Sequence, residues 1–155
     1  MYYSFIMLKP DALERQLVLE ILEWLKETGV AIETLDYRLV SKEQIFKHYE
    51  HVIAELGQSF KEKAVNSFVG KYVIPMIVSS GDVNIIANIR KEIGATDPSK
   101  AAAGTIRGDL GIDSMAKATL ENRCCDNLIH ASDSYEAYLA ESELWFGKDI
   151  SKKYV

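Results

Sequence analysis

Asn127-Leu128-Ile129-His130-Ala131-Ser132-Asp133-Ser134 is the most informative stretch of the sequence. Its apolar part predicts a short strand at 127–130, which carries one histidine to a small, hydroxyl-rich turn. Asp133 with Glu136 has the form of a capping box, so we expect a helix to begin there. A histidine between a strand end and a helix N-terminus lies beside unpaired backbone N–H groups, and this arrangement favours a bound phosphate.

The imidazole of His130 could serve as a nucleophile or proton carrier near neutral pH if a neighbour orients the ring. Two candidates for that role are Ser132, in the same turn, and Glu141, two turns into the helix. For a histidine considered alone, the better explanation is a core residue whose nitrogens bond nearby backbone and hydroxyl groups. The remaining motifs favour the functional interpretation.

Length and composition predict one globular domain over 1–155. Of the 155 residues, 48% are hydrophobic and 26% are charged, and the net charge is -5. The acidic balance argues against a specific nucleic-acid partner, although a local basic pocket remains compatible with it. Lys9 and Asp11 interrupt the apolar N-terminus, so we expect no export signal. Apolar runs such as 72–78 are far shorter than the roughly 20 residues of a membrane span, so we expect a cytoplasmic protein without a membrane partner.

Two groups of potential metal ligands or reactive side chains give weak signals. Cys124 and Cys125 are adjacent, which suits neither a relaxed disulfide nor a metal site, and we expect reduced thiols rather than a redox switch. His48, His51 and Glu55 could form a metal site on one helix, but a helix with scattered polar groups explains them equally well.

Hydrophobic periodicity predicts the order of elements. The pattern indicates a strand at 3–8, a helix from Pro10 to Gly29, a strand at 31–40, helices at 41–53 and about 59–69, a strand at 72–79 and a helix at 82–93. The strand at 3–8 is apolar almost throughout, as expected when both faces are covered. Pro75 within 72–79 indicates a bulge or an edge strand.

Residues 94–111 have little periodicity, and long loops of this kind in compact domains are usually functional. Arg107 could present a planar, permanently charged fork to phosphate oxygens, and the flanking Gly104 and Gly108 permit close backbone approach. Thr96 adds a hydroxyl donor. The segment at 111–126 predicts a further helical turn at 114–120, with no assigned function.

Three motifs together resemble the signature of the nucleoside diphosphate kinase family. They are Asn-x-x-His-Ala-Ser-Asp-Ser at 127–134, Gly-Thr-Ile-Arg-Gly-Asp at 104–109 and Lys9-Pro10-Asp11. The resemblance runs from about residue 3 to residue 146 in the family's order, which is far more specific than any single motif. Together with the split βαβ order of elements, it implies an α/β (α+β) ferredoxin-like sandwich, a four-stranded antiparallel sheet with helices packed on one face.

The resemblance also implies an activity. His130 would take the terminal phosphate of a nucleoside triphosphate such as ATP and pass it to a nucleoside diphosphate in a ping-pong reaction, with Glu141 and Ser132 orienting the ring. The matching nucleotide and phosphate contacts are Lys9, Tyr49, Phe60, Arg90, Thr96, Arg107 and Asn127. Considered singly, the cations among them would be solvated charges and the aromatics core residues. The sequence contains no P-loop and no protein-kinase Gly-rich loop, which agrees with a two-step mechanism.

Cofactor and partners follow from the same resemblance. The sequence has no carboxylate cluster able to cage a divalent ion, so Mg²⁺ would be held mainly by the nucleotide phosphates. We expect a homo-oligomer, a hexamer in preference to a tetramer. The sequence departs from the family at Ala103, where proline is usual, and in the long segment at 111–126. The alternative function is a catalytically silent, oligomeric nucleotide-binding or regulatory module.

Overall fold

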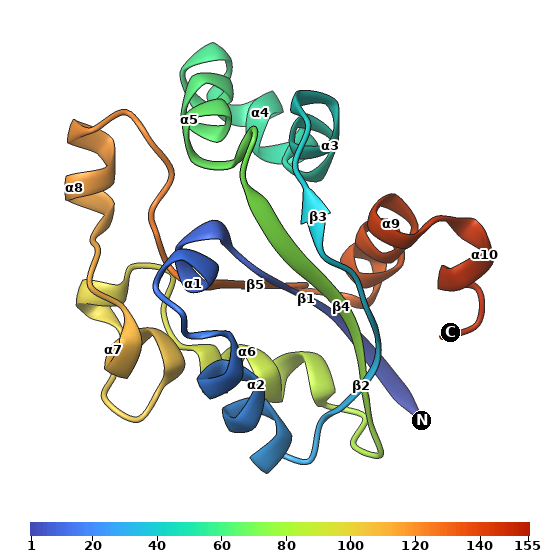
Figure 1. Cartoon of the computed structure of the whole chain (residues 1–155). Helices are drawn as coiled ribbons and strands as arrows, with labels where there is room; N and C mark the ends of the chain where they lie inside the picture. Colours follow the sequence, from blue (N-terminus) through green and yellow to red (C-terminus); the bar gives the residue numbers. More distant parts are fainter.

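An antiparallel sheet forms the centre of the protein in the computed structural model, which describes residues 1–155 (Figure 1). The sheet contains β1 (Tyr2–Leu8), β2 (Ala31–Leu35), β4 (Tyr72–Ser80) and β5 (Ile129–Ala131), in the order β2-β4-β1-β5. The two-residue β3 (Arg38–Leu39) pairs with the start of β4. The predicted ferredoxin-like α+β fold is confirmed, with β3 as a short addition.

The helices connect these strands and complete the chain after β5. They are α1 (Pro10–Glu14), α2 (Val18–Glu27), α3 (Lys42–His48), α4 (Glu50–Leu56), α5 (Gln58–Phe68), α6 (Ile85–Ile93), the 3-10 helix η1 (Pro98–Lys100), α7 (Ile106–Leu110), α8 (Met115–Leu120), α9 (Tyr135–Phe146) and α10 (Lys148–Ser151). The helix predicted around 114–120 is therefore confirmed as α8. No helix combines the length and the apolar character that crossing a bilayer requires.

Two helices predicted as continuous are each divided. The chain leaves the helical path between α1 and α2, where Gln16 has a φ of 58°. Another break falls at Tyr49, whose φ of -100° and ψ of 22° separate α3 from α4. Periodicity reports which residues face the core, and Leu13 and Leu17 both pack on it, so a turn that preserves the buried face is invisible in the pattern.

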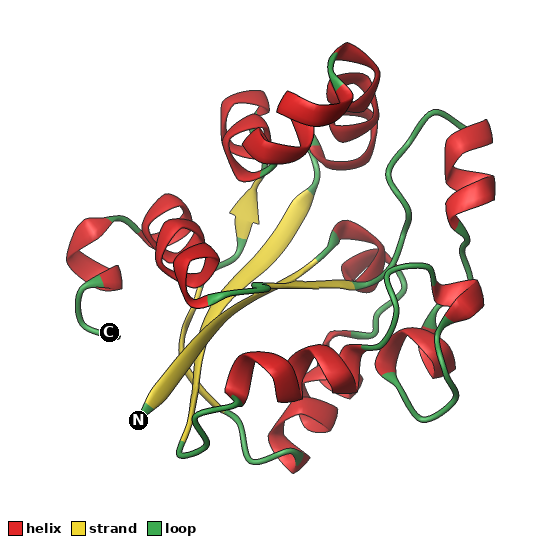
Figure 2. Ribbon diagram, turned by 180° about the vertical axis from the view of Figure 1, so that it is seen from behind, coloured by secondary structure: helices red, strands yellow, loops and turns green.

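Helices cover both faces of the sheet, so the expectation of helices on one face is wrong. Ile6 and Leu8 of β1 point into a cluster formed with α2 and α6. Phe5 and Met7 point to the opposite face, into a cluster formed with α3, α5 and α9. Figure 2, seen from behind, shows helices on both sides of the strands. Alternate residues of a strand point to opposite faces, and in β1 both sets are apolar, so both faces of the sheet must be covered.

The strand predicted at 31–40 is interrupted after Leu35. Asp36 N donates to Pro75 O at 3.1 Å across the interruption. Pro75 itself lies in β4, which is a central strand, so the edge-strand expectation is wrong, and the irregular register lies in β2. The proline is tolerated because its missing N–H would point to the same side as its carbonyl, where no continuous partner strand runs.

Candidate functional site

His130 occupies the middle of β5, where it pairs with Met7 of β1. Its Nε2 lies 2.7 Å from Glu141 Oε2, and Ser132 Oγ donates to the same oxygen at 3.1 Å. The structure therefore places Glu141 and Ser132 beside His130, as the sequence predicted. Ser132 is fully buried, so the group is supported from within the protein.

The start of α9 sets the position of Glu141. Ser134 is the N-cap, and its hydroxyl accepts a hydrogen bond from Ala137 N at 3.1 Å. The helix predicted to begin here is confirmed, but the N-cap is Ser134 and not Asp133, and Ala137 at the third helical position has no side chain to complete a capping box, so the predicted capping box does not form. Asp133 instead lines the cavity beside His130.

The hydrogen bond from Glu141 determines which nitrogen of His130 is free. A carboxylate accepts hydrogen bonds, so Nε2 carries the ring hydrogen and Nδ1 keeps its lone pair. The sequence left this choice open. The geometry leaves Nδ1 as the nitrogen with a free lone pair.

A cavity of about 220 Å³ opens beside His130. Its walls include most of the residues proposed from the sequence: Lys9, Tyr49, Arg90, Thr96, Arg107, Asn127 and Glu141. Phe60 does not line this cavity. It packs against Tyr49, with ring centroids 5.3 Å apart. The segment at 94–111, the strand ends and the α3–α4 corner therefore meet at one place, although they are far apart in the sequence. The segment predicted as a loop at 94–111 in fact contains η1 and α7.

Lys9 is a buried cation at the wall of this cavity. Its ammonium donates to Cys125 O at 2.8 Å and to Asn127 Oδ1 at 2.7 Å, and only 6% of the residue is exposed. Burial lowers the pKa of Lys9, and the nearby Asp11 carboxylate opposes that change. The solvated-charge interpretation of this lysine is wrong.

Arg107 is held by backbone carbonyls. Its guanidinium donates to Asn127 O at 3.0 Å, to Gly94 O at 3.2 Å and to Ile129 O. Burial, reinforced by the charge of Arg90, lowers the pKa of Arg107 to about 10, so the group remains charged at neutral pH. Three acceptors fix the plane of the guanidinium beside the cavity.

Asn127 joins the two sides of the cavity. Its Oδ1 accepts from Lys9, and its Nδ2 donates to Thr96 O at 2.9 Å. Gly108 allows the neighbouring loop to pack closely, because a Cβ there would lie 1.9 Å from Ala102 O. The predicted close backbone approach in this loop is confirmed at that glycine.

Comparison with known proteins finds a family match along almost the whole chain. The family model for nucleoside diphosphate kinase matches residues 3–150. The chain belongs to the nucleoside diphosphate kinase family. A family member from Streptococcus pneumoniae (strain Hungary19A-6) is 39% identical over 147 residues, which cover 94% of this chain and 100% of the relative.

Solved structures of the family have the same fold. The nucleoside diphosphate kinase from Borrelia burgdorferi, a transition-state mimic with bound vanadate and ADP, has a TM-score of 0.87 at 25% identity and covers 96% of this chain and 88% of its own. The Halobacterium salinarum enzyme in complex with CDP has a TM-score of 0.78 at 29% identity, with coverage of 95% and 88%. The family resemblance read from the motifs is confirmed.

Within this family fold, sequence reasoning missed the contribution of Asp11. The sequence assigned this residue no role in the site, yet its buried carboxylate accepts a hydrogen bond from Leu128 N at 3.1 Å. Leu128 has a φ of 72°, so this bond stabilises an unusual backbone turn directly before the catalytic strand. An aspartate two residues after Lys9, at the end of an apolar strand, was the available signal.

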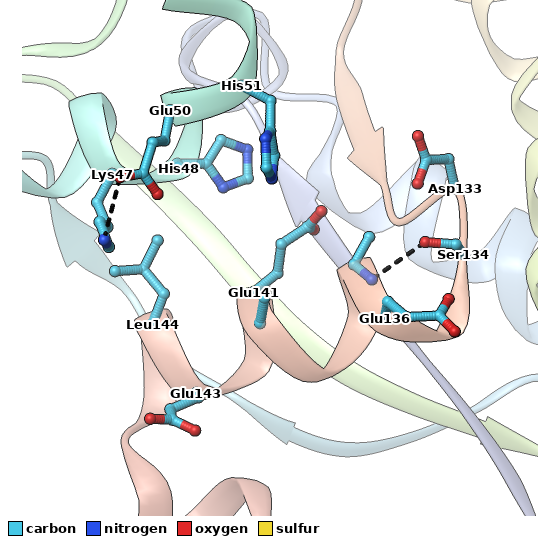
Figure 3. Close-up of a pocket in the computed structure, with 12 residues that line it drawn as sticks. Lys47, His48, Glu50, His51, Asp133, Ser134, Glu136, Glu141, Glu143 and Leu144 are labelled. Carbon is cyan, nitrogen blue, oxygen red and sulfur yellow. Dashed lines mark hydrogen bonds and ion pairs between the residues drawn. The ribbon is translucent and has the colours of Figure 1, made fainter. Parts of the chain in front are cut away.

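A larger cavity of about 870 Å³ lies on the other side of Glu141, between α9 and the α3–α4 corner. Figure 3 shows the carboxylate of Glu141 directed from α9 toward His48 and His51. The metal site considered for His48, His51 and Glu55 does not form. Instead, one potential ligand atom each from His48, His130 and Glu141 lie within 4.8 Å of one another.

Proposed function

We propose that this chain transfers the terminal phosphate of a nucleoside triphosphate, such as ATP, to a nucleoside diphosphate through a phosphohistidine on His130. One observation carries the proposal: Nδ1 of His130 is free while Glu141 holds Nε2 at 2.7 Å, beside a cavity lined by cations. A binding module would have no need for a histidine oriented in this way, so the silent-module alternative is not favoured.

In the first step, the Nδ1 lone pair of His130 attacks the terminal phosphorus, and the bond from phosphorus to the bridging oxygen breaks. The nucleoside diphosphate leaves with that electron pair. The positive charge that forms on the ring is stabilised through its Nε2–H by Glu141. In the second step, a terminal oxygen of the incoming diphosphate attacks the phosphorus, and the electron pair of the P–N bond returns to Nδ1.

The cavity residues supply positioning and charge, which dominate catalysis of phosphoryl transfer. Lys9, Arg90 and Arg107 would neutralise phosphate oxygens. Thr96 would donate its hydroxyl, while Asn127 acts by holding Lys9 and the loop. Tyr49 would contact the nucleotide from the α3–α4 corner. Phe60, behind it, would support or extend the surface on which a base stacks, a contact that tolerates every base.

Mg²⁺ would be held mainly by the phosphates of the nucleotide, and when bound it would supply positive charge that offsets the developing negative charge. The cavity fits this mode of binding. Its walls are rich in cations and amides, and its carboxylates, Asp133 and Glu141, do not form a cage for the ion.

The sheet edge supports assembly of several copies. β2 is an edge strand of the path β2-β4-β1-β5, and its Ile32 and Leu35 are 43% and 50% exposed. Leu19 on the adjacent α2 is 75% exposed. An exposed apolar edge strand is a ready template for pairing, so we propose a homo-oligomer that buries this surface, with a hexamer expected before a tetramer.

The domain organisation and the cellular location are also part of the proposal. Residues 1–155 would act as one domain, since both apolar clusters pack on the same sheet. The cytoplasmic location expected from the sequence is supported by two free thiols, Cys124 and Cys125.

Intact-mass analysis tests the mechanism directly. The protein is incubated briefly with Mg-ATP and then with a nucleoside diphosphate, with His130→Ala in parallel. We expect one acid-labile phosphate on the wild type, absent from the variant and removed by the diphosphate. If the wild type binds ATP and yet never gains mass, the phosphohistidine mechanism is wrong and the silent module replaces it.

A further inference from the structure

His48 is in direct contact with His130, although it does not line the cavity whose walls include Lys9, Arg90 and Arg107. The two rings meet edge to face, with centroids 4.6 Å apart and planes at 77°. His48 is the last residue of α3, and the break at Tyr49 turns the chain away immediately after it. This ring is therefore held by the α3–α4 corner against the nucleophile.

Trp145 determines the tautomer of His48. The indole Nε1–H of Trp145 donates to His48 Nδ1 at 3.1 Å. An indole nitrogen is only a donor, so His48 Nδ1 must be an acceptor, and in the neutral ring Nε2 then carries the hydrogen. Burial, together with the charges of His130 and Lys9, lowers the pKa of His48 well below its ordinary value, which keeps the ring neutral.

This tautomer excludes the simplest metal interpretation of the cluster. His48, His130 and Glu141 are close enough to share one ion. A metal on His48 Nε2 would need the lone pair of that nitrogen, and the ring hydrogen would then move to Nδ1, opposite the Trp145 N–H. Two hydrogens would face each other, so the Trp145 bond and a metal on Nε2 are incompatible.

The Nε2–H of His48 is instead a buried donor without a partner. Such a group costs about 1–3 kcal/mol if it stays unsatisfied, and its presence needs an explanation. Glu141 is a carboxylate acceptor in the same cluster as His48. The two hydrogen bonds that it accepts, from His130 and Ser132, both fall on Oε2. Oε1 remains available to a further donor.

We propose that His48 is a positioning residue for His130: its Nε2–H bonds the free oxygen of Glu141 when nucleotide is bound, and so fixes the carboxylate that orients the nucleophile. The arrangement forms a chain of hydrogen bonds from Trp145 through His48 and Glu141 to His130. Catalytic hydrogen bonds are often long in the free enzyme and shorten when the substrate is bound. This inference rests on the phosphohistidine mechanism proposed above.

Substitutions at residue 48 separate the donor from the bulk of the ring. His48→Gln places an amide N–H near the position of Nε2, His48→Asn is too short to do so, and His48→Phe keeps an aromatic ring without a donor. We expect phosphorylation of His130 to slow roughly 10- to 100-fold in the Asn and Phe variants, the loss of one hydrogen bond to a charged group. Nucleotide affinity should change little, and His48→Gln should recover most of the rate.

Nuclear magnetic resonance of ¹⁵N-labelled histidines gives a second measurement that needs no turnover. In the free wild type, both His48 and His130 should be protonated on Nε2 and unprotonated on Nδ1. With ADP bound, where the proposed bond to Glu141 forms, His48→Phe should leave His130 with a mixture of tautomers, whereas the wild type should keep its hydrogen on Nε2. His51→Gln serves as the matched control, because His51 is exposed on the same corner and should change neither rate nor spectrum.

Several outcomes would overturn the role of His48. They are wild-type phosphorylation rates in His48→Phe, a folded His48→Gln as slow as His48→Asn, a His48 ring protonated on Nδ1, and one-to-one binding of Zn²⁺ that is lost in His48→Phe. A wild type that never takes up phosphate would refute the proposed mechanism instead, and the His130 tautomers of the wild type and His48→Phe with ADP bound would still decide the role of His48.

Discussion

His130 and Glu141 are joined by a hydrogen bond of 2.7 Å between Nε2 and Oε2, although they come from a strand and a helix on opposite sides of a tight turn. This single contact assigns the tautomer and leaves Nδ1 free, and in the proposed mechanism it identifies the attacking nitrogen and the group that stabilises the charged ring. It therefore links the fold of the last quarter of the chain to the proposed chemistry.

Replacement of Glu141 by glutamine should slow phosphorylation of His130 roughly 10- to 100-fold, because an amide stabilises the charged ring much less than a carboxylate does. Single-turnover mass spectrometry with Mg-ATP measures this rate. Ser132→Ala should have a smaller effect, since the serine bonds only the carboxylate. Equal rates in the wild type and Glu141→Gln would show that the contact is not used.

Replacement of Arg107 by lysine should destabilise the protein by about 1–3 kcal/mol and weaken nucleotide binding, because a lysine cannot bond three backbone carbonyls at once. Urea denaturation and calorimetric titration with ADP measure the two effects. Arg15→Lys is the matched control: Arg15 donates to Leu110 O at 2.7 Å but does not line the cavity. Arg15→Lys should lower stability without changing nucleotide affinity. Unchanged affinity in Arg107→Lys would show that Arg107 does not contribute to nucleotide binding.

Stability should decrease as the solution is acidified. Burial, reinforced by His130 and Lys9, lowers the pKa of His48 from 6.5, so the unfolded chain binds a proton that the folded chain does not. Unfolding thus takes up a proton below about pH 6.5, and the free energy of unfolding falls by at most about 1.4 kcal/mol per pH unit for this group.

Thermal denaturation between about pH 7 and about pH 5 measures this effect. His48→Gln should have a shallower pH dependence than the wild type. His51→Gln should retain the wild-type dependence, because that side chain is exposed. Identical slopes for wild type and His48→Gln would show that His48 is not the responsible group.

A charge on the edge strand should reduce the size of the assembly. Ile32→Lys and Leu35→Lys place an ammonium group on the apolar surface of β2, where burial against another copy would desolvate it. Light scattering coupled to size exclusion should then show a smaller species. Leu120→Lys, on the 88% exposed end residue of α8, is the control. If the assembly keeps its size in both β2 variants, the interface lies elsewhere.

Much of the site was predictable because its motifs lie at element boundaries. Lys9 follows a strand and His130 lies on one, so residue type and local pattern together marked both. Arg107 was marked by its position near two glycines in a segment predicted as a loop, and the helix α7 that contains it was not predicted. Phe60 was carried over from the family alone, and the structure places it behind Tyr49 rather than in the cavity wall. For His48 the sequence offered either a metal site with His51 and Glu55 or a scattered polar position on a helix. In the structure its neighbours are His130 and Glu141, and the break at Tyr49 that places it there leaves no trace in the periodicity.

The sequence by itself determined the family, the order of the main strands and helices, the apolar character of both faces of β1 and the choice of His130 as the proposed nucleophile, since these depend on residue type and local spacing. The tertiary structure alone decided which nitrogen of His130 is free, that Lys9 is buried between carbonyl oxygens, and that His48 and Trp145 lie behind the nucleophile. Each of these depends on the distance between atoms far apart in the chain, and that distance is set by packing of α3 and α9 on the same face of the sheet.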